Sequence, residues 1–271
     1  MHPYLRLYRV ADWLHFLPLP LAGWLADRAG GTALAAGTAA WALALAFTSA
    51  INQAFDDRID HGAKNPVGRA FHRRRAVALS IAPAVGAIAL LAIGSPRGLG
   101  PGVIMLVAAA VYSAPPRLKR VPVVGTVWNA VMGVPGFFFA GGLAAGRLPL
   151  GPLVGLFALL LLVSQLLHEA ADRDDDAGQV RTIATEGGRR SAIAAALVLV
   201  LATPGLAWAL AAGATHRGAL SGACAAFALG WAAVLRRELG CDDRRRLRRL
   251  RLAYRYAAIG LGAVAFAALY L

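Results

Sequence analysis

Long apolar blocks alternate with short, mostly basic polar segments along most of the 271-residue chain. A block of roughly 20 apolar residues is the length that crosses a bilayer as an α-helix. We interpret each block as a membrane-spanning helix, and Gly and Pro residues mark several of the ends. The blocks cover residues 11–27, 32–55, 76–95, 99–113, 122–145, 149–171, 190–213, 217–235 and 252–271. The pattern therefore predicts an all-α, polytopic membrane protein with nine transmembrane helices.

The composition supports a single membrane domain. Hydrophobic residues make up 58% of the chain and charged residues only 15%, whereas about a quarter of the residues of a soluble domain are charged. No polar stretch is long enough to form a separate soluble domain, so we expect one transmembrane domain over residues 1–271. The first block contains Asp12, Pro18 and Pro20 and eight blocks follow it, which argues against a cleaved signal peptide.

The basic residues predict the orientation of the chain. With nine spans, the N-terminus and the loops after spans two, four, six and eight share one side, and these segments, counted together with Arg255 near the start of the last span, hold 24 of the 28 Lys and Arg residues. Positively charged loops stay in the cytoplasm. We therefore expect a cell-membrane protein with a cytoplasmic N-terminus, and the net charge of +14 needs no nucleic-acid partner to explain it. The basic run at residues 242–255 is interpreted as a surface stretch on anionic lipid headgroups.

An acidic motif follows the second apolar block, in the sequence NQAFDDRID at residues 52–60. Asn52, Asp56 and Asp60 are spaced four residues apart. If the helix continues, this spacing places all three on one face. Asp57 falls off that face, and we treat it as a supporting or solvated residue.

A second acidic motif ends the sixth block, in the sequence HEAADRDDD at residues 168–176. Asp172 and Asp176 repeat the four-residue step, and Glu169 comes three residues before Asp172 as a weaker candidate ligand. Asp174 and Asp175 lie off this face. With the predicted topology, both acidic motifs stand at the cytoplasmic ends of their helices.

Carboxylates crowded at the negative end of a helix dipole need a cation to offset them. Oxygen ligands suit Mg²⁺, which binds through one or two carboxylates and shares its coordination with substrate phosphates. Several bases follow the motifs or the fourth block, namely Lys64, Arg69, Arg117, Lys119, Arg120 and Arg181. Together these residues predict a magnesium site for a diphosphate. The alternative is a pair of solvated helix ends, and the repeated spacing on one side favours the site.

The motifs resemble those of the UbiA superfamily of intramembrane prenyltransferases. NQAFDDRID is similar to the first signature of that family, and DRDDD at residues 172–176 is similar to the second. RTIAT at 181–185 resembles the basic stretch that follows the second signature. YSAPPRLKRVP at 112–122 and LYRVADWL at 7–14 resemble its loop after the fourth helix and its opening. The resemblance covers residues 6 to about 190.

The resemblance implies a helical fold around a central cavity that opens sideways to lipid. It implies two Mg²⁺ ions on an isoprenyl diphosphate and transfer of the prenyl group to an acceptor, often an aromatic ring. The implied metal ligands and catalytic residues are Asn52, Asp56, Asp60, Asp172 and Asp176. The implied substrate-binding residues are Arg9, Lys64, Tyr112, Lys119, Arg120 and Arg181.

The sequence also departs from the family. Gln53 stands where the family often has Asp, and the loop KNPVGRAFHRRR at 64–75 keeps only Lys64, Asn65 and Pro66 of the usual pattern. These departures leave open a terpene cyclase, in which the prenyl chain attacks itself without an external acceptor. Asn129 in the fifth block either binds substrate in the cavity or makes an interhelical hydrogen bond.

A cation transporter is a third reading, because acids within membrane helices often mark ion paths. The acids here stand at helix ends rather than across the bilayer, which argues against a path. Our primary prediction is a magnesium-dependent prenyltransferase that acts on an isoprenyl diphosphate and a hydrophobic or aromatic acceptor, and binds no nucleic acid.

Overall fold

The computed structural model describes residues 3–14, 17, 31–56, 65–68, 70–132, 151–178, 180–212 and 216–270. Within these residues the regular structure is helical, and an isolated bridge pairs Val67 with Phe71. The chain divides into two compact units, of residues 1–118 with 132–150 and of residues 119–131 with 151–271. Each unit is described separately below.

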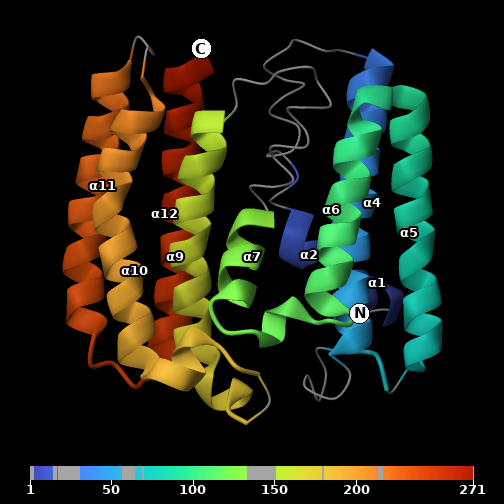
Figure 1. Cartoon of the computed structure of the whole chain (residues 1–271), viewed down its shortest axis with the longest axis horizontal. Coiled ribbons are helices and arrows are strands. Elements are labelled where there is room, and N and C mark those ends of the chain that lie inside the picture. Colours follow the sequence, from blue (N-terminus) through green and yellow to red (C-terminus); the bar gives the residue numbers. More distant parts are fainter. Residues whose placement is uncertain are drawn as a thin grey trace. The chain divides into compact units, whose positions relative to one another are not determined.

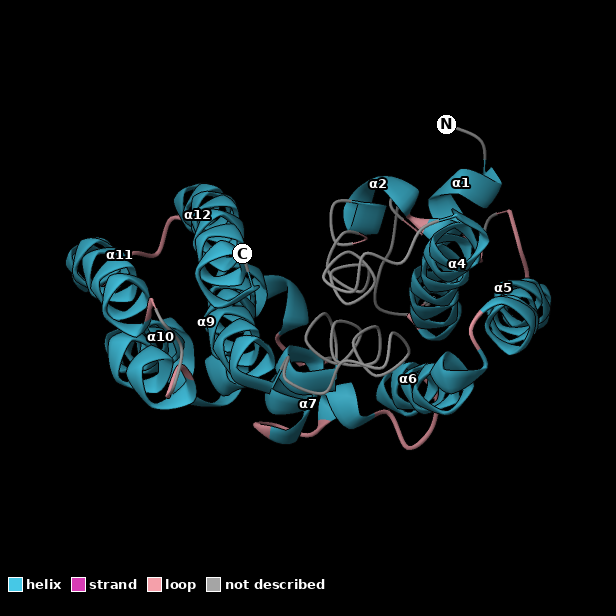
Figure 2. Cartoon of the chain, turned by 90° about the horizontal axis from the view of Figure 1, so that it is seen from above, coloured by secondary structure: helices cyan, strands magenta, loops and turns pink. Residues whose placement is uncertain are grey.

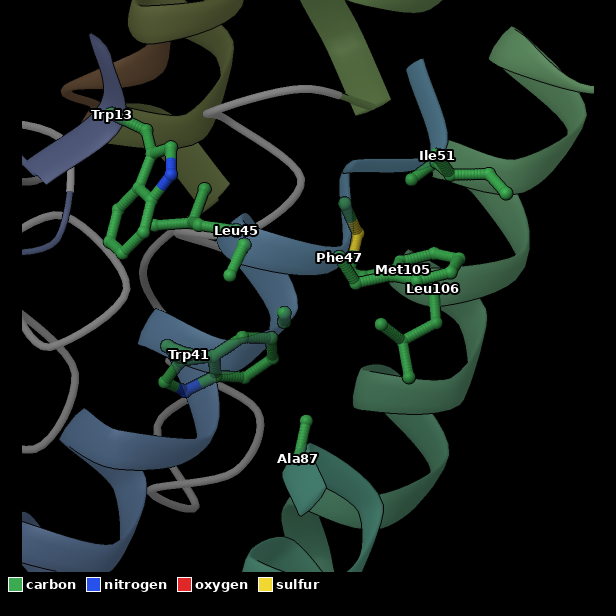
Figure 3. Packing of buried hydrophobic residues seen from close by; sticks show 11 residues of the cluster. Trp13, Trp41, Leu45, Phe47, Ile51, Ala87, Met105 and Leu106 are labelled. Carbon is green, nitrogen blue, oxygen red and sulfur yellow. The ribbon is translucent and has the colours of Figure 1, made fainter. Parts of the chain in front are cut away.

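The first unit is built from three long helices and two short ones (Figure 1). They are α1 (Pro3–Tyr8), α2 (Val10–Trp13), α4 (Gly31–Phe55), α5 (Arg73–Gly94) and α6 (Leu99–Ser113). The 3-10 turn η2 (Pro96–Gly98) joins α5 to α6. Apolar side chains from α2, α4, α5 and α6 form its core, and Figure 3 shows Phe47 of α4 beside Met105 of α6.

Small residues allow the helices of the first unit to approach closely. A Cβ atom added to Gly94 would lie 2.4 Å from the Cβ of Ala36, and one added to Gly102 would lie 2.4 Å from Leu91 Cδ1. Close packing of this kind drives helix association in membranes, where lipid is as apolar as the helix surfaces. The glycines therefore set the spacing between α4, α5 and α6.

The second unit contains four long helices beside a short one (Figures 1 and 2). They are α7 (Val124–Met132), α9 (Gly151–Asp176), α10 (Ile183–Leu210), α11 (Arg217–Glu238) and α12 (Arg244–Tyr270). The short turn η3 (Leu118–Arg120) precedes α7. The α9 helix packs against both α10 and α12, and Phe227, Trp231 and Tyr254 form an aromatic group between α11 and α12.

Six helices of the described chain are long and apolar enough to cross a membrane, namely α4, α5, α9, α10, α11 and α12. They match predicted spans two, three, six, seven, eight and nine. The fourth predicted span is α6, which has the predicted bounds but only 15 residues. Spans one and five extend into residues outside the described part, so the count of nine and the side of the N-terminus stay predictions.

Three of these helices begin earlier than the apolar pattern predicts. The α5 helix begins at Arg73 rather than 76, and α12 begins at Arg244 rather than 252. The α10 helix begins at Ile183 rather than 190, after a capping box in which the side chains of Thr182 and Thr185 each accept from the other residue's backbone N–H. Gly188, with φ of 84° and ψ of 161°, breaks this helix, so its long unbroken part starts next to the predicted bound. Hydropathy marks only the segment inside the membrane, whereas caps and ion pairs extend a helix beyond it.

Candidate functional site

The first acidic motif closes α4. The backbone N–H of Asp56 donates to the carbonyl of Asn52 at 3.0 Å, so the two residues stand one turn apart as the spacing predicts. Asn52 Oδ1 accepts a hydrogen bond from Ser113 Oγ of α6 at 3.2 Å. Asp56 is buried at 8% exposure, while Asp60 lies outside the described residues. The contact between α4 and α6 therefore anchors Asn52, one of the two predicted ligands that the structure describes.

Arg117 is the cation that the structure brings to this motif. Its Nη2 donates to the carbonyl of Phe55 at 2.5 Å and lies 3.4 Å from Asp56 Oδ1. Arg117 follows the cis Pro115–Pro116 bond and has a left-handed backbone, with φ of 63°. The sequence placed Arg117 among the nearby bases but not among the binding residues. Its position directly after the Pro-Pro turn was the available signal.

The loop after the motif also fastens onto the end of α4. Asn65 Nδ2 donates to the carbonyl of Gln53 at 3.0 Å, and Asn65 Oδ1 accepts from the N–H of Val67. Arg73 Nε donates to the carbonyl of Ala54 at 3.2 Å. The last carbonyls of a helix lack partners within the helix, and cationic donors suit its negative end. The loop KNPVGRAFHRRR thus stabilises α4, although it departs from the family pattern.

The structure also describes four other predicted binding residues, Arg9, Tyr112, Lys119 and Arg120. Arg9 has a left-handed backbone between α1 and α2, with φ of 47°. Tyr112 and Lys119 are partly buried, and Arg120 is exposed. Lys64 lies outside the described residues, as does Arg69. The substrate-binding roles of these residues remain predictions.

The second acidic motif is helical to its end, because α9 continues to Asp176. Asp172 lies between two cationic or potentially cationic side chains. Arg248 of α12 donates to Asp172 Oδ1 from Nη2 at 2.8 Å and from Nε at 3.2 Å. On the other oxygen, His168 Nδ1 lies 2.9 Å from Asp172 Oδ2. Asp172 is therefore held in one orientation, and its neighbour on the ligand face, Asp176, is partly buried.

The off-face acids of this motif are not simply solvated. Asp175 pairs with Arg244 and Arg248 of α12, and Asp174 pairs with Arg189 of α10. Arg189 is buried and also donates from Nε to the carbonyl of Ala170 at 3.1 Å. These ion pairs tie the C-terminal end of α9 to both α10 and α12.

Part of the basic run at 242–255 has partners within the protein. Arg244, Arg246 and Arg248 pair with carboxylates inside the second unit, with Glu238 as the partner of Arg246 at 2.5 Å. Arg245 and Arg249 are exposed and fit the lipid-facing interpretation. The sequence pattern did not separate these two sets, because the partners come from other helices.

Glu169 forms the centre of a buried hydrogen-bond network. Its Oε1 accepts from Thr126 Oγ1 of α7 at 2.6 Å and from Gln165 Nε2 at 3.3 Å. Its Oε2 accepts from the backbone N–H of Ile183 at 3.1 Å, which is the start of α10. A carboxylate at a helix N-terminus is stabilised by the helix dipole. Glu169 thus fastens α7 and α10 to α9, which accounts for its burial at 4% exposure.

Asn129 and Arg181 both have protein partners. Asn129 Nδ2 donates to Gln165 Oε1 at 2.7 Å, which is the interhelical hydrogen bond left open by the sequence. Arg181 is exposed and pairs with Glu186 through Nε at 3.0 Å and Nη2 at 3.2 Å. The hydrogen bonds and charge of Glu186 raise the pKa of the Arg181 guanidinium. Substrate binding by Arg181 requires it to exchange this partner for a phosphate.

The donor chemistry of both motifs fits Mg²⁺. Asn52 and Asp56 offer amide and carboxylate oxygens, and Asp172 and Asp176 offer carboxylates, which are the hard ligands that Mg²⁺ prefers. The described residues contain no group of three or more His, Cys, Asp or Glu placed to hold a metal ion. One or two carboxylates from the protein are sufficient where phosphate and water complete the coordination.

Comparisons with known proteins agree with this architecture. The family model described as the UbiA prenyltransferase family matches residues 16–255. A solved UbiA homologue from Archaeoglobus fulgidus bound to DMAPP and Mg²⁺ has a TM-score of 0.79 and 23% identity, over 99% of this chain and 99% of that one. The same homologue bound to GPP and Mg²⁺ has a TM-score of 0.77 and 22% identity over 100% of both chains.

A third solved structure is more distant. The apo UbiA homologue from Aeropyrum pernix K1 has a TM-score of 0.69 and 19% identity, over 97% of this chain and 98% of that one. A search of curated protein sequences finds no match. At these identities the solved structures show a shared fold.

Proposed function

The chain belongs to the UbiA prenyltransferase family, and from this premise we propose that it is a magnesium-dependent intramembrane prenyltransferase. It ionises an isoprenyl diphosphate and transfers the prenyl group to an acceptor, which is hydrophobic or aromatic. The observation that carries the proposal is the position and the ion pairing of the two acidic motifs. Each ends a long apolar helix, and each presents an aspartate already oriented by an arginine, Asp56 by Arg117 and Asp172 by Arg248.

The proposed roles follow the chemistry of the side chains. Asn52, Asp56 and Asp60 hold one Mg²⁺ ion, and Asp172 and Asp176 hold a second. When bound, these ions neutralise the diphosphate and make it a better leaving group. The homologue from A. fulgidus was solved with DMAPP or GPP together with Mg²⁺, which supports the same class of ligand here.

The bases complete the neutralisation of the diphosphate. Arg9, Lys64, Lys119, Arg120 and Arg181 supply positive charge to its oxygens. Tyr112 and Asn129 are proposed to contact the substrates. The hydrogen bond that Asn129 donates to Gln165 would hold its side chain in place for that contact. We place the acidic motifs on the cytoplasmic side of the cell membrane, because the basic loops next to them stay inside.

The reaction breaks the bond between the prenyl C1 and the diphosphate oxygen, and the electron pair leaves with the diphosphate. The allylic cation is then attacked by the acceptor, which loses a proton to complete the substitution. Water would quench this cation, so the reaction requires a dry, apolar surrounding. Long apolar helices such as α4 and α9 provide that surrounding and accommodate the prenyl chain.

The test is a diphosphate-release assay on the purified protein with geranyl, farnesyl and geranylgeranyl diphosphate, Mg²⁺ and a panel of aromatic acceptors. We expect release that requires an acceptor, and a loss of about 100-fold or more in Asp56→Asn and Asp172→Asn. This exceeds the effect of losing a residue that only supports a ligand. Asp242→Asn is the matched control, because the Asp242 side chain is 90% exposed.

Two outcomes would change the assignment. Release without any acceptor, with a cyclised product detected by mass spectrometry, would make the protein a terpene cyclase. Activity close to that of the unmodified protein in both Asp56→Asn and Asp172→Asn would remove the acidic motifs from the chemistry and refute the proposal.

A further inference from the structure

A series of hydrogen bonds connects the start of α10 to α7 by way of α9. The backbone N–H of Ile183 donates to Glu169 Oε2 at 3.1 Å, and Glu169 Oε1 accepts from Gln165 Nε2 at 3.3 Å. Gln165 Oε1 in turn accepts from Asn129 Nδ2 of α7 at 2.7 Å. All four residues belong to the second unit, and Figures 1 and 2 show α7 next to α9. We call Glu169, Gln165 and Asn129 the hydrogen-bond relay.

The direction of each bond in the relay is set at its Glu169 end. A backbone N–H can only donate, and a carboxylate can only accept. Glu169 therefore receives the NH₂ group of Gln165 and not its oxygen. This leaves Gln165 Oε1 facing α7, and an amide oxygen also only accepts. Asn129 must then turn its own NH₂ group toward Gln165, which agrees with the observed contacts.

The relay is buried at its Glu169 end, which makes the opposite direction unfavourable. Thr126 Oγ1, one turn before Asn129 on α7, also donates to Glu169 Oε1, at 2.6 Å. Thr126 and Glu169 are both buried, at 3% and 4% exposure. A reversed Gln165 would place its oxygen against the carboxylate and its NH₂ group against that of Asn129. Buried polar groups without a partner are costly, so one direction of the relay is favoured.

The carbonyl end of the Asn129 amide is consequently turned away from Gln165. The Asn129 side chain is partly exposed, and within the described part of the chain it has Gln165 as its hydrogen-bond partner. Its Oδ1 is therefore an acceptor that is left for a ligand. Because Gln165 fixes the amide, Asn129 cannot turn its NH₂ group to that ligand without losing the bond of 2.7 Å.

We propose that Gln165 and Glu169 are positioning residues that hold the Asn129 carbonyl toward the acceptor, so that Asn129 selects acceptors with a hydroxyl or N–H group. The proposal rests on the prenyltransferase function given above. An ionised diphosphate only accepts hydrogen bonds and is repelled by a carbonyl oxygen, and a prenyl chain has no group that donates. Gln165 is also seven residues before Asp172, or about 10 Å along α9. The acceptor is the substrate whose chemistry fits Asn129.

The first test compares matched compounds on the unmodified protein. Phenol is paired with anisole, and indole with benzofuran, which has nearly the same shape but an oxygen in place of the N–H. The affinity is the KM at saturating prenyl diphosphate, or the inhibition constant where a compound is not prenylated. The compound with the hydroxyl or N–H should bind at least tenfold more tightly in at least one pair. Equal affinities in both pairs would overturn the proposal without affecting the assignment as a prenyltransferase.

The second test uses variants of the relay. Asn129→Leu should weaken binding of the hydroxyl or N–H compound, because the accepting oxygen is lost. Gln165→Met should instead strengthen binding of its partner compound, because the released amide can turn its NH₂ group outward. In both variants the affinity ratio should fall below threefold, with the KM of the prenyl diphosphate unchanged. A role of Gln165 in packing alone would not change the preference in this way.

Ser164→Ala is the matched control, because Ser164 is the neighbour of Gln165 on α9 and is equally enclosed, at 5% exposure, but lies outside the relay. It should keep the affinity ratio of the unmodified protein. A ratio that persists in both Asn129→Leu and Gln165→Met would overturn the proposal. A rise in the KM of the prenyl diphosphate in Asn129→Leu would assign Asn129 to the diphosphate, and would overturn it as well.

A binding experiment separates failure of the relay from failure of the proposed function. If no prenyl diphosphate gives diphosphate release, the prenyltransferase assignment fails. The relay is then tested by the thermal unfolding midpoint of the protein in nanodiscs with each of the four compounds. The hydroxyl or N–H compound of at least one pair should stabilise the unmodified protein more than its partner does, and Gln165→Met should lose this difference. Where Gln165→Met does not fold, the partly exposed Asn129→Leu takes its place. The absence of a difference in the unmodified protein, or its persistence in the variant, would overturn the proposal.

Discussion

Replacing Glu169 with Ala should destabilise the second unit more than any change at an exposed acid. The substitution removes the acceptor of three donors, Thr126 Oγ1, Gln165 Nε2 and the N–H of Ile183. The backbone N–H is fixed by α10 and cannot turn to another partner, and a buried donor without a partner costs about 1–3 kcal/mol. The Thr126 hydroxyl can rotate, and Gln165 keeps its bond from Asn129. We therefore expect a loss of about 2–4 kcal/mol.

The variant Glu169→Gln tests the same reasoning more finely. Its amide keeps one accepting oxygen but places an NH₂ group where Glu169 accepts a hydrogen bond. The amide oxygen of the variant can accept from the Ile183 N–H, and the Thr126 hydroxyl can rotate to accept from the new NH₂ group. The NH₂ group of Gln165 then faces another NH₂ group and loses its acceptor. We expect a loss of about 1–2 kcal/mol, smaller than that of the alanine variant.

The assay is equilibrium unfolding in mixed micelles, with the thermal midpoint as a second measure. Glu186→Ala is the matched control, because its carboxylate is exposed and pairs with the exposed Arg181, and such pairs add little stability. Magnesium binding is measured in parallel. If Glu169→Ala is as stable as the control but binds Mg²⁺ poorly, the carboxylate is a metal ligand and the structural reasoning is refuted.

One further substitution in each unit tests the packing of that unit. Arg117→Ala should lower the stability of the first unit by about 1.5–3 kcal/mol because the carbonyl of Phe55 loses a charged donor, and unchanged unfolding would contradict this. Gly262→Ala should cost about 1–3 kcal/mol in the same assay because the new methyl group collides with Phe157 and forces α9 and α12 apart. Gly260→Ala meets open space, and equal effects of the two glycine variants would refute the proposed helix contact.

Much of the fold was predictable from hydropathy. An apolar segment of about 20 residues has one low-energy form in lipid, a helix that satisfies its own backbone hydrogen bonds. The predicted spans therefore correspond to α4, α5, α6, α9, α10, α11 and α12. Hydropathy is less informative at helix ends, where Thr182 caps α10 and Asp175 pairs with the early turn of α12 at Arg244.

The sequence by itself determined the family, the helical class and the two acidic motifs with their four-residue spacing, because these depend on local order along the chain. Only the tertiary structure decided which base accompanies each acid. Arg117 reaches Asp56 from 61 residues away, and Arg248 reaches Asp172 from 76 residues away. Such pairs depend on how each helix is rotated about its axis and on the register between neighbours. One sequence does not specify either, since similar apolar surfaces pack in several registers.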